Sequence, residues 1–554
     1  MLAGFVPYPE SFVKIYKQKG YWFDKTLGEE FDEFVGKYSD RVALSFQGEH
    51  VTYRQLGTRV NRLALHFVHI GLKTYDRMIF QLPNEPEFVY CFYAAVKIGV
   101  IPIAALPAHR EAEISFFATS TSAKAHAVPS RYKGFSHQDM SRAIRKKEQK
   151  LEYTFVSGDR VDTDLISITR LLTEPIEKCV SIDSLEKYRP DPMEPAVFQL
   201  SGGTTGIPKV IPRTHNDYSA NFRRAAEITH TNMDSVMGIA IPISHNFAMS
   251  SPGFLGTLHN GGRVVLIPST KTEVVLEAVE KEKITIMPTP PALLIRWMES
   301  EALSKYDLSS LEVVLAGGAK LNTEVAKRVK PALGCDFHQN LGMSEGMLFW
   351  SRRDDPEDIL LNTQGAPMFE DDELRVVDEI DNEVAPGETG SLLVRGPTTI
   401  RGYYNSPEYN TTAFTKDGFY RTDDIVRLYK GRYVSVEGRT KDTINRGGEK
   451  ISAEEVENHI LAHPKVENCA YVAMPDHKLG EKGCAFVSTK VNQMLSFDEL
   501  IEFLKTGRHI ATFKLPERLE LVREFPLTKV GKIDKKELRR IITEKLSDES
   551  KVRK

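Results

Sequence analysis

Glycines, hydroxyl side chains and a lysine are concentrated between Leu200 and Lys209, where the sequence is LSGGTTGIPK. Glycine lets backbone N–H groups approach an anion closely, hydroxyls donate hydrogen bonds, and a lysine adds positive charge. The spacing is not that of a P-loop, because no Gly-Lys-Ser/Thr ends it and Pro208 opposes a helix beginning at the lysine. The segment follows a predicted strand and predicts a polyphosphate-binding loop; the alternative is a flexible surface loop.

Further motifs follow one another along nearly the whole chain. They are TYRQL at 52–56, GMSE at 342–345, GFYRTDD at 418–424, EGR at 437–439, RGGEK at 446–450 and PLTKVGK at 526–532. With the glycine-rich loop, this order resembles the adenylate-forming superfamily of acyl-CoA synthetases, luciferases and peptide-synthetase adenylation domains. Five more segments resemble the stand-alone 2,3-dihydroxybenzoate–AMP ligases of siderophore biosynthesis: ALPAHR at 105–110, IPRTH at 211–215, SHNF at 244–247, AGGAK at 316–320 and NRGGEK at 445–450.

The resemblance implies a two-step reaction. An aryl acid attacks the α-phosphate of ATP, giving aryl-AMP and pyrophosphate, and the acyl group then passes to the phosphopantetheine thiol of an aryl carrier protein or to coenzyme A. Because two anions must meet, catalysis is mainly positioning and charge neutralisation. The resemblance assigns the binding of ATP and Mg²⁺ to the following residues: Ser201, Gly202, Gly203, Thr204, Thr205, Gly206, Lys209, Gly318, Asn340, Glu345, Asp424 and Arg439.

Within that set the implied roles differ. Thr204, Thr205 and Lys209 would hold the β- and γ-phosphates, and Glu345 would bind Mg²⁺. Asp424 would accept the ribose hydroxyls, with Arg439 nearby. Gly318 and Asn340 would flank the adenine, although the family usually has an apolar residue in place of Asn340. Asp423 also departs from the family, which has Gly there, and the resemblance leaves its effect on ATP binding open.

Three residues are implied in catalysis. Lys532 matches the lysine that bridges the carboxylate and the α-phosphate; a lone lysine would otherwise be a solvated surface charge, as Lys529 is expected to be. After adenylation the small domain would rotate about a hinge at Lys441, so that the segment carrying Lys450 lines the thiol tunnel. His245 matches the aromatic gate, and the alternative is a packed structural histidine.

The substrate pocket is implied around Asn246. Amino-acid-activating relatives carry Asp there, and its carboxylate pairs with the substrate ammonium; Asn would leave that cation unpaired. The amide can instead donate to an ortho-hydroxyl oxygen. The other pocket residues are Phe247, Ser251, Gly317, Ala319 and Leu348. Ser251 is typical of dihydroxybenzoate enzymes and Leu348 of salicylate enzymes, so 2,3-dihydroxybenzoate is favoured and salicylate stays open.

These residues need elements that position them. Short apolar runs such as 77–82, 196–200, 236–241, 263–267, 284–287 and 311–315 alternate with amphipathic stretches such as 274–283, which predicts α/β layers with largely parallel sheets. After Gly438 a charged segment precedes an α+β pattern. We therefore expect an N-terminal domain of layered α/β subdomains at 1–438, a hinge at 439–442 and a small mobile α+β domain at 443–554.

Composition restricts the alternatives. Lys and Arg number 73 against 76 Asp and Glu, so binding of nucleic acid or a membrane by positive charge alone is not expected. The five cysteines form no C-x-x-C pair, and no signal peptide or membrane span is recognisable, which favours a cytoplasmic protein. The chain ends 22 residues after Lys532, so a carrier protein would be a separate chain. A benzoate- or fatty acyl-CoA ligase and a non-catalytic ATP-binding or carrier-docking protein remain as alternatives.

Overall fold

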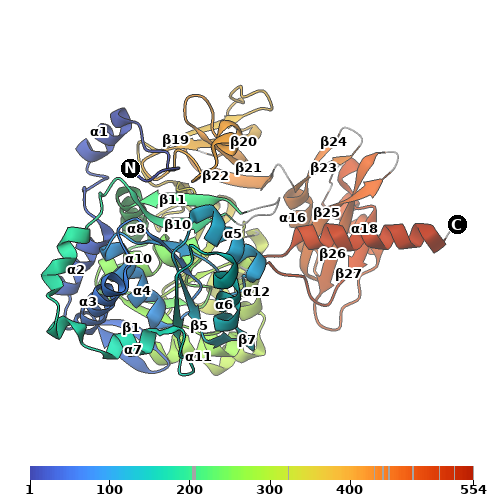
Figure 1. The fold of residues 1–554 in the computed structure, drawn as a ribbon. Helices are drawn as coiled ribbons and strands as arrows, with labels where there is room; N and C mark the ends of the chain where they lie inside the picture. Colours follow the sequence, from blue (N-terminus) through green and yellow to red (C-terminus); the bar gives the residue numbers. More distant parts are fainter. Residues whose placement is uncertain are drawn as a thin grey trace.

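The structure is a computed structural model, and it describes residues 1–552 except 202–207, 322, 430, 440–441, 447–448, 477–478, 509, 511 and 529–530. The side chains at 439, 445, 449–450 and 550–552 also lie outside the description. The larger body, at the left of Figure 1, contains the N-terminal domain, and the smaller body at the right contains the C-terminal domain. The expected α/β class with a large and a small domain is confirmed.

A nine-stranded sheet forms the base of the larger domain. Its strands, in spatial order, are β18 (Ala366–Pro367), β17 (Leu348–Trp350), β16 (Asp336–Gly342), β15 (Val313–Gly317), β14 (Ile286–Thr289), β12 (Val236–Ile239), β13 (Arg263–Leu266), β1 (Val42–Phe46) and β2 (Glu49–Thr52). The pairs from β1 through β13, β12, β14 and β15 to β16 are parallel. Parallel strands covered on both faces require nearly continuous apolar runs, which is why they were recognisable in the sequence.

A seven-stranded sheet lies beside it. Its order is β11 (Val210–Thr214), β10 (Pro195–Leu200), β4 (Ile101–Ala104), β3 (Arg77–Phe80), β5 (Ala125–Pro129), β8 (Tyr153–Ser157) and β9 (Ile166–Ser167). Strands β10 and β11 form an antiparallel pair at its edge. The glycine-rich segment connects these two strands along the chain. A further pair, β6 (Arg131–Tyr132) and β7 (Phe135–Ser136), stands apart.

Helices fill the space between and around these sheets. One group of helices packs together, and members of the group contact each of the two sheets. It consists of α2 (Leu27–Lys37), α3 (Tyr53–Ile70), α4 (Pro86–Lys97), α8 (His215–Ile228), α9 (Asn246–Ser250) and α10 (Gly253–His259). The seven-stranded sheet also contacts α5 (Glu111–Thr121), α6 (His137–Lys147) and α7 (Ile168–Thr173); the nine-stranded sheet contacts α11 (Thr272–Glu282), α12 (Pro291–Met298) and α13 (Thr323–Leu333). The remaining helices of this domain are α1 (Glu10–Gln18), α14 (Glu357–Asn362) and α15 (Pro407–Ala413).

The TYRQL motif has a structural role at the start of α3. Thr52 is the N-cap: its side chain accepts a hydrogen bond from the Gln55 backbone N–H, and the Gln55 side chain accepts one from the Thr52 N–H at 2.9 Å. This reciprocal capping satisfies two helix N–H groups. The Tyr53 hydroxyl is buried and donates to backbone carbonyls of Leu258 and Gly262.

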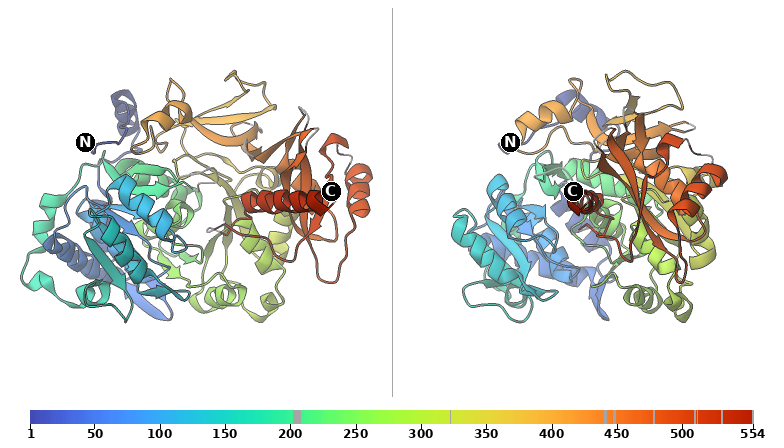
Figure 2. Two further views of the ribbon diagram at one scale, coloured as in Figure 1. Left: turned by 45° about the vertical axis from the view of Figure 1, so that its right-hand side comes forward. Right: turned by 90° about the vertical axis from the view of Figure 1, so that its right-hand side faces the viewer.

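A four-stranded antiparallel sheet bridges the larger domain to the smaller one (Figure 1). Its strands are β19 (Glu373–Val377), β20 (Thr389–Arg395), β21 (Tyr420–Leu428) and β22 (Val434–Arg439). The smaller domain has strands β24 (Glu449–Ser452), β23 (Thr443–Arg446), β26 (Gly480–Thr489), β25 (Val466–Asp476) and β27 (Arg518–Leu521), with α16 (Ala453–Leu461), α17 (Phe497–Glu502) and α18 (Lys535–Val552). Figure 2 shows this domain lying against the larger one, with α18 along its side.

Candidate active site

The glycine-rich loop closes the hairpin between β10 and β11. Leu200 pairs with Val210, the Ser201 N–H donates to the Lys209 carbonyl at 3.0 Å, and the Lys209 N–H donates to Ser201 Oγ at 2.8 Å. The Lys209 ammonium lies 4.5 Å from the centroid of the Tyr409 ring. Both ends of the predicted phosphate loop are thus fixed by the sheet edge. The loop residues Gly202, Gly203, Thr204, Thr205 and Gly206 lie outside the described residues, so their phosphate contacts stay predictions.

Glu345 lies in the loop between β16 and β17 and is 8% exposed. The Tyr403 hydroxyl donates to its Oε1 at 2.7 Å, and the Tyr403 and Tyr420 hydroxyls are 2.9 Å apart. Burial and the nearby Glu345 charge raise the pKa of both phenols, so they stay protonated. No group of three His, Cys, Asp or Glu side chains suited to a metal ion occurs in the described part of the chain.

A buried ion pair stabilises the loop that carries Glu345. Arg213 and Asp217 have fully buried side chains joined at 2.7 Å. The same guanidinium donates to the backbone carbonyls of Ser344 at 3.0 Å and Thr398 at 3.2 Å. The partners Asp217, Ser344 and Thr398 come from three separate parts of the chain, so no local sequence pattern reveals this arrangement.

Asp424 occupies a bulge in β21. Its side chain is buried, its N–H donates to Thr422 Oγ1 at 3.1 Å, and it pairs in register with Arg439 of β22. The residue before it, Asp423, is exposed and has a φ of 62°, in the left-handed region that glycine adopts without strain. This explains the glycine expected at that position; aspartate is among the residues that tolerate the conformation. The Arg439 side chain lies outside the described part.

Lys532 reaches the larger domain from the smaller one. A turn presents it: the Thr528 N–H donates to the Lys532 carbonyl at 2.7 Å, and the Lys532 N–H donates to Thr528 Oγ1 at 3.1 Å. Gly318 has a φ of 87°, and a Cβ placed on it would lie 3.0 Å from Lys532 Cε and 3.3 Å from Nζ. A side chain at Gly318 would therefore obstruct the lysine, so the two residues are matched in shape.

The His245 ring is the N-cap of α9, where its Nδ1 accepts from the Phe247 N–H at 3.2 Å. Burial and the Lys532 ammonium lower the pKa of His245 to about 4. The imidazole is therefore neutral at physiological pH. Its capping contact supports a structural role for this residue; the gating role stays a prediction.

Asn246 is held by two hydroxyl groups. Its Oδ1 accepts from Tyr218 Oη at 2.9 Å and from Ser250 Oγ at 3.0 Å, and the residue is 6% exposed. The direction of each hydrogen bond is determined by the next residues in the network. Gln199 Nε2 donates to Tyr218 Oη at 3.0 Å and faces Met249 Sδ at 3.1 Å. A thioether has no hydrogen to donate, so the Gln199 NH₂ must face it and the Tyr218 hydrogen is directed to Asn246.

The direction of the hydrogen bond from Ser250 to Asn246 is determined in the same way. Asn221 Nδ2 donates to the Ser250 backbone carbonyl at 2.9 Å, which can only accept, and the same NH₂ lies 3.4 Å from Ser250 Oγ. Ser250 Oγ is therefore free to donate to Asn246. Burial raises the pKa of Tyr218 to about 12, which keeps its hydroxyl protonated. Oδ1 of Asn246 is thus occupied by two donors, and its NH₂ group has no acceptor among the described residues.

The other predicted pocket residues divide into two groups. Phe247, Ser251 and Leu348 are buried, and Gly317 is closely packed: a Cβ on it would lie 2.0 Å from Asn340 Oδ1 and 3.0 Å from Phe247 Cζ. Ala319 is exposed on the neighbouring loop. The Asn340 side chain thus lies on the Phe247 side of the site, where the sequence predicted contact with adenine; that adenine contact stays a prediction.

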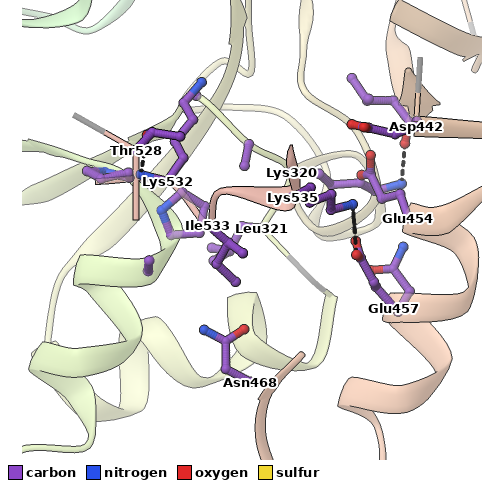
Figure 3. Close-up of a pocket in the computed structure, with 18 of the residues that line it drawn as sticks. Lys320, Leu321, Asp442, Glu454, Glu457, Asn468, Thr528, Lys532, Ile533 and Lys535 are labelled. Carbon is purple, nitrogen blue, oxygen red and sulfur yellow. Dashed lines mark hydrogen bonds and ion pairs between the residues drawn. The ribbon is translucent and has the colours of Figure 1, made fainter. Parts of the chain in front are cut away.

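A cavity of about 350 Å³ joins the two domains, and Gly318, Ala319, Asn340, Asp424 and Lys532 all line it. In Figure 3 Lys532 and Ile533 lie on one side, and on the other Lys535 points to Glu457, 2.7 Å away. Burial raises the pKa of the adjacent Glu454 to about 7. Lys441 lies outside the described residues, as does the side chain of Lys450, which is on edge strand β24.

The geometry defines a cavity between two domains, lined by the buried carboxylate of Asp424 and by Lys532 from the smaller domain. Comparison with known proteins then gives the family. The chain belongs to the AMP-binding enzyme family. The family's main domain matches residues 31–404 of this chain, and the AMP-binding enzyme C-terminal domain matches residues 455–532. It is therefore an adenylate-forming enzyme, and membership implies the use of ATP.

Individual relatives align over almost their whole length. The chain is 44% identical over 546 residues to a 2,3-dihydroxybenzoate-AMP ligase of Bacillus subtilis, covering 99% of both chains. It is 45% identical to a salicylyl-CoA synthase / salicylate adenylyltransferase of a Streptomyces species, covering 97% of this chain and 98% of the other. The apo structure of Mycobacterium smegmatis MbtA matches with a TM-score of 0.73 at 36% identity, covering 97% and 99%. No helix among the described residues is long and apolar enough to cross a membrane.

Proposed function

We propose that the protein activates an aryl acid, most simply 2,3-dihydroxybenzoate, as its adenylate and transfers it to the phosphopantetheine thiol of a separate aryl carrier protein in siderophore biosynthesis. The observation that carries the proposal is the fixed polarity of Asn246. Its NH₂ is the free end, so it can donate to a phenolic oxygen ortho to the carboxylate. Relatives named for dihydroxybenzoate and for salicylate support an aryl acid, and salicylate is the alternative substrate.

In the first step the carboxylate oxygen attacks the α-phosphorus and the bond to pyrophosphate breaks. Lys532 would neutralise the carboxylate and the α-phosphate, as its place beside Gly318 supports. The loop from Ser201 to Lys209 would hold the departing phosphates, and Asp424 would accept the ribose hydroxyls with Arg439 nearby.

Glu345 fits a magnesium ion, because a buried carboxylate oriented by the Tyr403 hydroxyl is the hard oxygen ligand that this ion takes. Bound there with the phosphates, Mg²⁺ would offset the charge of the leaving pyrophosphate. The protein's own contribution is to fix Glu345 through Tyr403 and through the Arg213 contact to the neighbouring Ser344 carbonyl.

In the second step the thiol sulfur attacks the acyl carbon and AMP leaves. We place the domain boundaries at 1–438, 439–442 and 443–554, with rotation at Lys441 withdrawing Lys532 and bringing the segment of Lys450 to the thiol path. Lys532 in its present position beside Gly318 suits the first step, so a rearrangement must precede the second.

The substrate pocket supports an uncharged ring. An amino acid would place its ammonium against the Asn246 NH₂, two donors facing each other without an acceptor. Phe247 and Gly317 give a flat apolar surface. Ser251, which follows shortly after Phe247 in the sequence, and Leu348, on a strand of the same sheet as Gly317, are also buried. A benzoate- or fatty acyl-CoA ligase would leave the Asn246 amide unpaired.

The proposal is tested by ATP–pyrophosphate exchange with 2,3-dihydroxybenzoate, salicylate, benzoate, a medium-chain fatty acid and several amino acids. We expect exchange with the two ortho-hydroxy acids and little with the others. Asn246→Asp should lower kcat/KM for both ortho-hydroxy acids by on the order of 10–10²-fold, because a carboxylate would face the phenolic oxygen and the substrate carboxylate. Exchange that prefers a fatty acid or an amino acid, or an Asn246→Asp variant with unchanged kinetics, would refute the aryl-acid proposal.

A further inference from the structure

Asn340 is a polar residue at a position where an apolar one was expected. It lies on β16, is 4% exposed, and its Oδ1 has no hydrogen-bond partner among the described residues. The Trp350 indole N–H, on the cross-strand partner of Asn340, also lacks a partner there, so the two groups do not hydrogen-bond to each other. Burial of an unpaired carbonyl oxygen is unfavourable, and a group that fills this site has to offset it.

The amide lies between two walls of the proposed aryl pocket. The position of a Cβ on Gly317 is within 3.0 Å of both Asn340 Oδ1 and Phe247 Cζ. The position of a Cβ on Gly342 is 3.1 Å from both Asn340 Nδ2 and Leu348 Cδ2. A side chain at Gly317 would displace the amide and one at Gly342 would crowd it, and register pairing puts Gly317, Asn340, Gly342 and Leu348 on one face of the sheet.

Asn246 and Asn340 present opposite polarities. The Oδ1 of Asn246 is occupied by Tyr218 and Ser250, which leaves its NH₂ as a donor. The Oδ1 of Asn340 is directed to the Gly317 side without a partner, which leaves an acceptor. A ring that enters between Phe247 and Leu348 and expels water must supply a hydrogen to that oxygen or leave it unsatisfied.

We infer that Asn340 is a specificity-determining residue whose Oδ1 accepts a hydrogen bond from a second ring substituent, a hydroxyl or amino group other than the ortho-oxygen facing Asn246. This inference rests on the proposed function and narrows the substrate class to benzoic acids with an ortho-hydroxyl and a further donor. 2,3-Dihydroxybenzoate is one member, and its 2,4- and 2,5-isomers are others. Salicylate, which lacks a second donor, is the poorer substrate.

The experiment is ATP–pyrophosphate exchange on the full-length enzyme. The acids are salicylate, the 2,3-, 2,4- and 2,5-dihydroxybenzoates, and 2-hydroxy-3-methoxybenzoate, whose methoxy oxygen can accept but not donate. We expect at least one dihydroxybenzoate to exceed salicylate by about tenfold in kcat/KM, the effect of one satisfied buried hydrogen bond, and the methoxy acid not to share the gain.

Asn340→Leu has nearly the same shape without polar atoms, so it should lower the dihydroxybenzoate-to-salicylate ratio about tenfold; a change in ATP binding would affect both acids alike and leave that ratio unchanged. Leu348→Val is the matched variant on the same wall: it enlarges the pocket without touching a hydrogen bond and should keep or raise the ratio. A thermal unfolding scan establishes that each variant is folded.

Each outcome of these exchange measurements either supports or overturns the inference about Asn340. A wild-type enzyme that prefers salicylate to every dihydroxy acid, an unchanged ratio in Asn340→Leu, or a methoxy acid as good as the hydroxy acid would overturn the inference while leaving the aryl-acid function intact. Exchange with no aryl acid at all would instead contradict the proposed function. The two failures are thus distinguishable in one data set.

Discussion

Replacing Tyr218 by phenylalanine removes one oxygen and tests what orients Asn246. That oxygen accepts from Gln199 at 3.0 Å and donates to Asn246 at 2.9 Å. The ring itself stays packed under the Arg213 guanidinium, which lies 4.9 Å from the centroid of the Tyr218 ring. The variant therefore removes one of the two donors that fix the Asn246 amide, and leaves the shape of the site unchanged.

The expected magnitude follows from one neutral hydrogen bond. Such a bond contributes about 1 kcal/mol net, or about fivefold in kcat/KM. Tyr218→Phe/Ser250→Ala removes both donors, and we expect about 2 kcal/mol, or roughly thirtyfold, with some departure from additivity because the two hydroxyls share one acceptor.

The assay compares 2-hydroxybenzoate with 2-aminobenzoate in pyrophosphate exchange. A phenolic oxygen accepts from the Asn246 NH₂, whereas an arylamine presents N–H groups and a delocalised lone pair, and so favours the reversed amide. The hydroxy-to-amino ratio should fall by the factors given above as the amide is released. A purely structural loss of packing would lower both rates together.

Tyr53→Phe is the matched control. Its hydroxyl is equally buried, but it donates to the Leu258 and Gly262 carbonyls rather than to the site. We expect a lower unfolding temperature and an unchanged ratio. A ratio that stays within about twofold of wild type in the double variant would refute the argument that these hydroxyls set the polarity of Asn246.

Five further variants, at four positions, are expected to behave as follows. Lys532→Ala should lower pyrophosphate exchange by on the order of 10²–10³-fold and spare transfer from preformed aryl-AMP to the carrier thiol, whereas equal loss of both would contradict its role. Lys450→Glu should do the reverse in the same two assays. Because Asp423 is exposed with a φ of 62°, Asp423→Gly should leave the KM for ATP unchanged, and Asp423→Val should lower the free energy of unfolding by about 1–2 kcal/mol in a urea titration; a large KM change in the glycine variant would show that the Asp423 charge matters. The pKa of His245, about 4, lies below the usual 6.5, so the unfolded chain binds the extra proton between these values and stability falls as pH decreases through that window. His245→Phe should reduce that fall and leave the pH profile of exchange between pH 6 and 8 unchanged.

The strands of the larger domain could be predicted because they are buried on both faces. The runs at 77–82, 196–200, 236–241 and 263–267 match β3, β10, β12 and β13 to within about two residues. The sheet of β19 to β22 was not recognised, because its strands mix exposed and buried positions without an apolar run.

The candidate site was predictable in its motifs but not in its supports. Asp424, Glu345 and Lys532 stand in recognisable segments, and the structure brings Asp424 and Lys532 to one cavity. The Tyr403 hydroxyl that holds Glu345 is 58 residues away in sequence. A tyrosine in a region of mixed polarity has no local pattern that reveals such a contact, because only the folded chain brings Tyr403 beside the loop of Glu345.

Asn246 and Asn340 show why a residue type alone does not determine what a pocket binds. An amide carries a donor and an acceptor of nearly equal size, so either end can face a ligand. At Asn246 the choice is made by two acceptors without hydrogens, the Met249 thioether and the Ser250 carbonyl, acting through the Gln199–Tyr218 and Asn221–Ser250 contacts. At Asn340 the choice is made by Gly317, which leaves room for the amide, and by the absence of a donor among the described neighbours. If these two amides bind the substrate as proposed, its preference also depends on the neighbours that orient them, and a variant of Met249 or Gly317 should change it as well as a variant of either asparagine.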